Sequence, residues 1–142
     1  MRILVHSDKD LSRRLGDGLR VHGLLKPLAQ KHQFDLICFS RDNEDLEPEL
    51  RNIFQSVTML PAPQQRRSPL LRRVFKSISA GDFKLTSEAM RDAVRLALHT
   101  RNYDLILEEA ANTVPNLPDG PLGAPLIVDS IDEPLLRELR AL

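Results

Sequence analysis

The sequence predicts an α/β fold in which a doubly wound, mainly parallel sheet of about five or more strands carries helices on both faces. Short apolar runs alternate with longer amphipathic stretches along the chain. The runs are continuously apolar, which is typical of parallel strands that are buried on both faces. The 142 residues fit a single domain, and an apolar content of 42% is enough to form a core.

Five apolar runs are the predicted strands. They lie at residues 3–5, 36–39, 57–60, 105–107 and 126–128, and Pro61 closes the third. In such a sheet, ligands bind beyond the carboxyl ends of the strands. Polar residues follow those ends here, so we expect the functional site at that edge.

Helical patterns fill the intervals between the runs. A first helix follows Gly18 with a leucine stripe, and Pro27 should kink it or end it early. Further helices are predicted over 46–54, over 70–78, over 87–100 with Thr86 or Ser87 as its cap, and from 132 onwards. The last pattern reaches Leu142 without a stop signal. This indicates either an interrupted chain or a natural C-terminal helix.

Charge and composition exclude several classes of function. Lys plus Arg and Asp plus Glu both number 20, whereas a dedicated nucleic-acid binder would show a basic excess. No apolar run approaches the length of a membrane span, and the first residues are charged too soon for a signal peptide. The single cysteine, Cys38, lies in an apolar run and is expected to be inert core. A cytoplasmic location is therefore predicted.

The segment Gly16-Asp17-Gly18-Leu19-Arg20 is the first candidate for chemistry. It follows the first strand and opens the first helix, where glycines allow close approach and free N–H groups attract an anion such as pyrophosphate. The third position of a dinucleotide fingerprint is Val21, which disfavours NAD binding in the usual manner. An ordinary glycine-containing loop that enters a helix is an equally good interpretation.

Acidic residues follow the last two predicted strands. Strand-end placement should bring them together on one rim, where carboxylates position sugar hydroxyls or act as a general base. Asp132 and Glu133 can instead simply complement a helix dipole. The acidic candidates are Glu108, Glu109, Asp129, Asp132 and Glu133.

Two further features, His6 and a run of basic residues, can have either a binding role or a purely structural one. His6 ends the first strand near the expected crevice and can contact a phosphate or sugar. A basic run can lie on an anionic membrane surface or form a solvated helix face. That run comprises Arg66, Arg67, Arg72, Arg73 and Lys76. No Cys/His cluster has the spacing of metal ligands, so no metal is predicted.

These segments together resemble the start of a GT-B glycosyltransferase of family four, of the bacterial type associated with exopolysaccharide biosynthesis. The similarity rests on the opening 1–5, the segment 16–20, the 24–29 helix pattern, and Phe34-Asp35-Leu36. Tyr103-Asp104-Leu105-Ile106 and the stretch 126–132 continue it. The similarity covers nearly all of the chain but only the first half of such an enzyme.

The resemblance implies that residues 1–142 are a Rossmann-like N-terminal, acceptor-side domain, with the nucleotide-sugar domain absent from this chain. It implies a hexosyltransferase that takes a nucleotide sugar as substrate, uses no cofactor, and acts on a glycan or lipid-linked acceptor, with peripheral membrane contact through the basic run. The donor pyrophosphate would lie against Gly16, Asp17 and Gly18, with Arg20 beside it. Glu108 and Asp129 are the catalytic candidates, and His6, Glu109 and Asp132 the acceptor-binding ones.

One departure from the family pattern concerns the cleft histidine that many members carry after the fourth strand. This chain has Leu107-Glu108-Glu109-Ala110 there, so a glutamate replaces that contact or the subgroup dispenses with it. The alternative function is a stand-alone α/β ligand-binding or regulatory module without catalysis.

Because the resemblance leaves the donor-binding half outside the chain, we expect the isolated 142 residues to show no turnover. Incubation with nucleotide sugars and glycan acceptors, followed by chromatography of the products, checks this. Detectable sugar transfer would contradict the prediction.

Overall fold

The computed structural model describes residues 1–8, 11, 16–40, 46–63, 86–109 and 113–129 of the chain. The predicted helices over 70–78 and from residue 132 lie outside these ranges, and so does the basic run 66–76. Within the described part of the chain, no helix has the length and apolar character that crossing a membrane requires.

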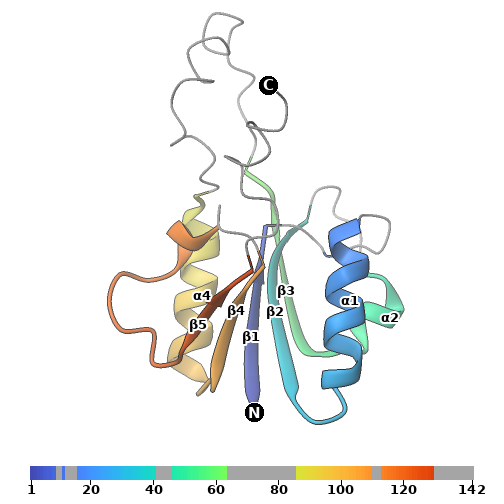
Figure 1. The fold of residues 1–142 in the computed structure, drawn as a ribbon. Coiled ribbons are helices and arrows are strands. Elements are labelled where there is room, and N and C mark those ends of the chain that lie inside the picture. The colour runs from blue at the N-terminus through green and yellow to red at the C-terminus, as the bar shows by residue number, and fades with distance from the viewer. Residues whose placement is uncertain (9–10, 12–15, 41–45, 64–85, 110–112, 130–142) are drawn as a thin grey trace, which may run out of the picture.

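The described residues form one five-stranded, all-parallel sheet in the order β3-β2-β1-β4-β5 (Figure 1). This confirms the predicted α/β fold with a doubly wound parallel sheet. The strands are β1 (Arg2–Ser7), β2 (Gln33–Ser40), β3 (Phe54–Pro61), β4 (Leu105–Glu108) and β5 (Leu126–Val128). The helices are α1 (Gly16–Leu28), α2 (Pro48–Arg51), α4 (Glu88–Thr100) and the short 3-10 helix η1 (Val114–Asn116).

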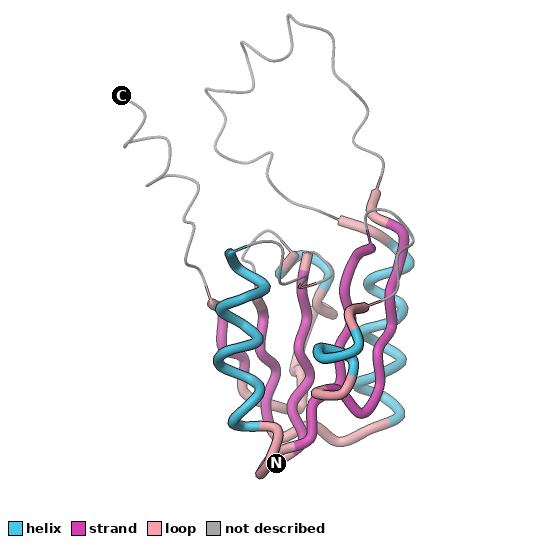
Figure 2. Tube along the Cα trace, turned by 90° about the vertical axis from the view of Figure 1, so that its right-hand side faces the viewer, coloured by secondary structure: helices cyan, strands magenta, loops and turns pink. Residues whose placement is uncertain are grey.

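Helices cover the sheet from both sides, with α1 and α2 on one side and α4 on the other (Figure 2). Side chains of successive strand residues point to opposite faces, so each strand contributes to two cores. Val5 and Leu36 pack on the α1 side, whereas Leu4 and Ile37 pack on the α4 side. Cys38 is fully buried in the α1-side core, as expected of an inert cysteine.

Helix α1 ends at Leu28, directly after Pro27, which agrees with the predicted early end. The predicted leucine stripe is right as the buried face only at Leu25 and wrong at its other three positions. Val21 and Leu25 face the sheet, while Leu19, Leu24 and Leu28 are exposed. The sheet-facing side begins instead at Gly18, which is buried without a side chain and therefore gives no apolar signal in the sequence.

The predicted helix over 46–54 is also wrong in extent. Only Pro48–Arg51 is helical, and Phe54 already begins β3. The apolar spacing of Leu50, Ile53 and Phe54 arises because a single helical turn and the start of a strand bury side chains in the same core. Packing, rather than one helical period, produced the pattern.

Helix α4 matches the prediction for 87–100 closely. Ser87 is its N-cap, and its hydroxyl accepts a hydrogen bond from the Met90 N–H at 3.4 Å. Met90 and Val94 are fully buried against the sheet, and Ala93, Ala97 and Leu98 pack beside them. The N-terminus of α4 also holds the segment between β4 and β5, because the Ser87 N–H donates a hydrogen bond to Asn116 Oδ1.

Candidate functional site

The candidate site lies at the carboxyl edge of the sheet, where β1 and β4 are neighbours. The chain runs from β1 outwards to β2 and β3, and then returns to β4 and β5 on the other side of β1. The strand order therefore reverses between β1 and β4. In open α/β sheets this switch point opens a crevice beyond the strand ends, in which ligands bind.

A buried polar chain starts at the end of β1. His6 Nδ1 lies 2.5 Å from Glu108 Oε2, and both side chains are fully buried. The other carboxylate oxygen of Glu108 accepts a hydrogen bond from the Thr113 hydroxyl. A carboxylate that accepts from both sides requires the imidazole proton on Nδ1. His6 Nε2 then carries the lone pair, and it has no hydrogen-bond partner in the described part of the chain.

The loop before β5 holds the buried hydrogen-bonded residues His6, Glu108 and Thr113 in place from the α4 side. Asn116 Nδ2 donates to the Thr113 carbonyl oxygen at 3.0 Å, and the Ser87 N–H donates to Asn116 Oδ1 at 2.8 Å. Thr113 and Asn116 are both fully buried. The hydroxyl that orients Glu108 is thus tied to the N-terminus of α4.

A second polar group lies on the α1 side of the same edge. Arg20, in the second turn of α1, donates from Nη2 to Glu109 Oε1 at 2.8 Å and from Nη1 to Asp129 Oδ2 at 2.5 Å. The Glu109 side chain is 2% exposed and that of Asp129 is 21% exposed. Glu108 and Glu109 point to opposite faces because side chains alternate along a strand. One dipeptide therefore serves both polar groups.

The structure thus brings together five residues that the sequence singled out separately. His6, Glu108, Glu109, Asp129 and Arg20 all lie at the carboxyl edge of β1, β4 and β5. Asp132 and Glu133 lie outside the described residues.

The segment Gly16-Asp17-Gly18 forms the first turn of α1 rather than a separate loop. It reaches the same edge because Arg20, one turn later, contacts Glu109 and Asp129. Both terminal nitrogens of Arg20 donate hydrogen bonds to carboxylates. The sequence predicts a contact between Arg20 and a phosphate instead. The role of the glycines toward a pyrophosphate stays a prediction.

Among the described residues, the charged groups of this cluster sum to a negative value. Three carboxylates, Glu108, Glu109 and Asp129, accompany one guanidinium, Arg20, which gives minus two before His6 is counted. Such a site favours donors of hydrogen bonds, such as sugar hydroxyls, over a polyphosphate. Among the described residues, no group of three or more His, Cys, Asp or Glu is arranged to hold a metal ion.

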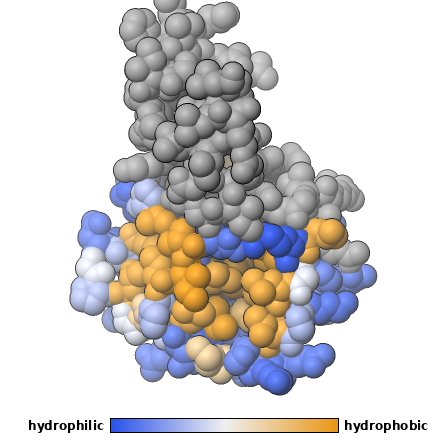
Figure 3. All heavy atoms as spheres, viewed as in Figure 1, coloured by the Kyte–Doolittle hydropathy of each residue, from blue (hydrophilic) through white to orange (hydrophobic). Residues whose placement is uncertain are grey.

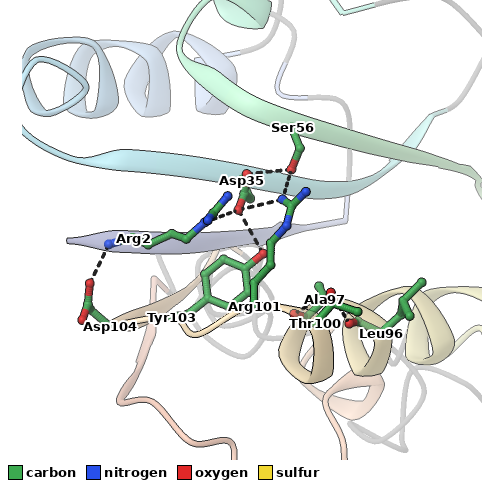
Figure 4. A network of polar contacts seen from close by, with 9 residues as sticks. All are labelled: Arg2, Asp35, Ser56, Leu96, Ala97, Thr100, Arg101, Tyr103 and Asp104. Carbon is green, nitrogen blue, oxygen red and sulfur yellow. Dashed lines mark hydrogen bonds and ion pairs between the residues drawn. The ribbon is translucent and has the colours of Figure 1, made fainter.

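A second polar cluster, which sequence reasoning missed, lies at the opposite, amino edge of the sheet (Figure 4). Asp35 accepts hydrogen bonds from Arg2 at 2.9 Å, Ser56 at 2.6 Å and Tyr103 at 3.0 Å, and Arg101 lies 3.1 Å from the same carboxylate. Asp35 lies in the family-like segment 34–36, which gives no sign that its carboxylate is buried. No sequence spacing links five residues scattered over a hundred positions.

Electrostatics identify this cluster as structural. Burial alone would raise the pKa of Asp35, but hydrogen bonds from Ser56, Arg2 and Tyr103 outweigh burial and lower the pKa below its ordinary value. Burial, and after it the hydrogen bond to Asp35, raises the pKa of Tyr103. The phenol therefore stays protonated and keeps donating. Asp35 has a full set of donors and lies far from the switch point along the strands.

The fold and its carboxyl-edge cluster define a Rossmann-like α/β domain with an acidic polar cluster at the switch point of its sheet. No family model matches the sequence, and no curated protein matches it. A solved structure that is similar is the C-terminal domain of a hydrogenase from Pyrococcus furiosus, with a TM-score of 0.57 and 15% identity over 90% of this chain and 89% of that one. At this identity the similarity shows a shared α/β fold and nothing of function.

Proposed function

We propose that this chain is the acceptor-side domain of a nucleotide-sugar-dependent glycosyltransferase of the GT-B kind, which transfers a sugar to a glycan or lipid-linked acceptor. The observation that carries the proposal is the acidic cluster at the switch point, where Glu109 and Asp129 share Arg20. The resemblance of the sequence segments to family four supplies the reaction class. Recognition of an acceptor, rather than of a nucleotide, fits the excess of carboxylates among the described residues of this cluster.

The chemistry of the cluster suits a polyhydroxyl ligand. Carboxylate oxygens accept hydrogen bonds from sugar hydroxyls, and a guanidinium held by two carboxylates keeps them fixed in position. Asp129 is the more exposed of the two acids and therefore the first contact for a sugar. Glu109 lies deeper on the same guanidinium and orients the arrangement.

His6 lies at the same carboxyl edge of the sheet, fully buried on the opposite face from Arg20. Glu108 holds the imidazole proton on Nδ1, so Nε2 is the nitrogen that can accept a proton from an acceptor hydroxyl. The developing charge on the leaving nucleoside diphosphate would be stabilised by groups of the donor side. In this arrangement the glycines at the start of α1 would face that diphosphate across the interdomain cleft.

Titration of the ¹⁵N-labelled chain with glucose, galactose, mannose and short oligosaccharides tests acceptor binding. We expect the amide resonances of His6, Arg20, Glu109 and Asp129 to shift on sugar binding. The Kd should lie in the millimolar range, which corresponds to a binding free energy on the order of −4 kcal/mol. Asp129→Asn should weaken binding about tenfold, because a neutral amide replaces a charged acceptor. UDP alone should bind more weakly than the best sugar.

The matched control is Asp92→Asn, which removes an exposed carboxylate on α4 whose ion pair within the described part of the chain is with Arg95. It should leave sugar binding unchanged. Binding of UDP or GDP at this edge, tighter than that of any sugar, would contradict the acceptor role. That outcome would favour the alternative, a stand-alone α/β ligand-binding or regulatory module without catalysis.

A further inference from the structure

One half of the α1 side of the sheet has no helix over it among the described residues. Helix α1 packs on β1 and β2 through Val21 and Leu25, and α2 packs beside β3. The same face of β4 and β5 carries Ile127, which is 52% exposed. Parallel sheets are normally covered on both faces, so an apolar strand face of this kind needs a covering element.

The side of α1 next to β4 and β5 is apolar as well. Arg20 reaches Glu109 and Asp129, so its side of the helix faces these strands. Residues four apart lie on the same side of a helix, which places Leu24 and Leu28 there. They are 44% and 37% exposed. Leu24 and Leu28 on the helix and Ile127 on β5 therefore belong to the same exposed apolar surface.

Helix and strand spacings line up along this surface. Four helical residues rise about 6 Å, and two strand residues rise about 6.6 Å. Below the polar level of Arg20, Leu24 therefore lies level with Leu107 and its register partner Ile127. Leu28 lies level with Leu105, one step further down. We call the three exposed residues, Leu24, Leu28 and Ile127, the uncovered face; beside them, Leu107 is buried in the α1-side core and Leu105 packs against that core.

Figure 3 views the molecule from this side. Apolar residues gather on both sides of a hollow, beneath a band of hydrophilic residues. A helix laid between α1 and β5 would fill such a hollow.

We propose that residues 131–142 of this chain pack on the uncovered face as an amphipathic helix. This segment follows β5 directly, and Asp129, the last described residue before it, lies at the upper end of the face through its ion pair with Arg20. The sequence pattern predicts a helix that starts near Pro134. Leu135, Leu139 and Leu142 are spaced to form one apolar stripe.

Length agrees with this assignment. A helix over the nine residues from Pro134 to Leu142 would extend about 13.5 Å. The strand segment from Leu105 to Glu109 rises about 13 Å. A helix that turns back after β5 can therefore cover the whole face without a long connection. The packing holds whether or not the domain serves a glycosyltransferase.

Methyl NMR on the full chain decides which molecule covers the face. We expect NOEs between the Ile127 δ1 methyl and leucine methyls of residues 135–142, assigned through single Leu→Ala variants. In an isotope-filtered sample that mixes labelled and unlabelled chains, these NOEs should vanish, because both groups belong to one molecule. Intermolecular NOEs would show a second copy on the face, and no NOEs to the segment would show that it packs elsewhere. Either result overturns the proposal.

Thermal unfolding gives a second, independent measurement. Leu139→Ala should lower Tm by about 5 °C, since a packed methyl cluster is lost from a domain of this size. Its effect should be non-additive with that of Leu24→Ala. Leu96→Ala, on the exposed side of α4 at 63% exposure, is the matched control and should leave Tm unchanged. An unaltered Tm in Leu139→Ala would contradict the proposal.

Discussion

Asp35→Ala is expected to lower the free energy of unfolding by about 3–5 kcal/mol. The carboxylate is 3% exposed and joins donors from β1, β3 and the segment after α4. Its loss leaves the Tyr103 hydroxyl buried without an acceptor, which carries most of the cost. Arg2 and Arg101 are partly exposed, so solvent offsets their loss.

Urea denaturation at neutral pH measures this change. Asp35→Asn should cost about 1–2 kcal/mol, because the amide still accepts hydrogen bonds but carries no charge. Asp92→Ala, on the exposed side of α4, should stay within about 0.5 kcal/mol of the parent chain. An effect of Asp35→Ala no larger than that of this control would contradict the structural role of the cluster.

Asp35 also makes the stability of the folded domain depend on pH. The pKa of Asp35 is lower in the folded than in the unfolded chain. Its contribution to stability is therefore fully present above the unfolded pKa of about 3.9 and is lost as pH falls through the folded value. The stability difference between the parent chain and Asp35→Asn should be constant above about pH 5 and should shrink below about pH 4.

Glu108→Ala is expected to destabilise the domain by about 3–5 kcal/mol as well, because it leaves a fully buried imidazole and a buried hydroxyl without their acceptor. Glu108→Gln should cost less, about 1–2 kcal/mol, since the amide oxygen can still accept one of the two hydrogen bonds. Chemical denaturation of both variants gives the two values.

A double-mutant cycle separates the pair from its surroundings. If His6 and Glu108 act through their direct contact, His6→Ala combined with Glu108→Ala should cost clearly less than the sum of the single changes. Additive effects would show that the two side chains stabilise the fold independently. Sugar titration of Glu108→Gln then reports whether the orientation of His6 affects the ligand edge, through a change in Kd without a loss of fold.

Much of this architecture is readable in the sequence because strands and helices have short-range periods. The five apolar runs each correspond to a strand, and Ser87 with the 89–98 pattern marks α4 to within one residue. The strand-end rule also indicated that the acids after β4 and β5 meet on one rim. Arg20 bridges Glu109 and Asp129 there.

Errors occurred where tertiary contacts override local pattern. Leu24 and Leu28 are predicted core residues by spacing, yet they are exposed because α1 presents Gly18, Val21 and Leu25 to the sheet. Phe54 continues a helical spacing but begins β3. The buried side of α1 depends on how that helix is rotated against the sheet, and the short extent of α2 depends on where the chain enters β3. No local period encodes either.

The sequence by itself determined that this protein is a parallel α/β domain and that its polar residues gather where strands end, because apolar runs of that length have few other folds. Only the tertiary structure decided which charges meet. Crossovers place β1 between β2 and β4, and this brings His6 within 2.5 Å of a residue 102 positions away and Arg20 onto an acid 109 positions away. Such pairs carry no sequence period, since their partners are chosen by the order of strands in the sheet.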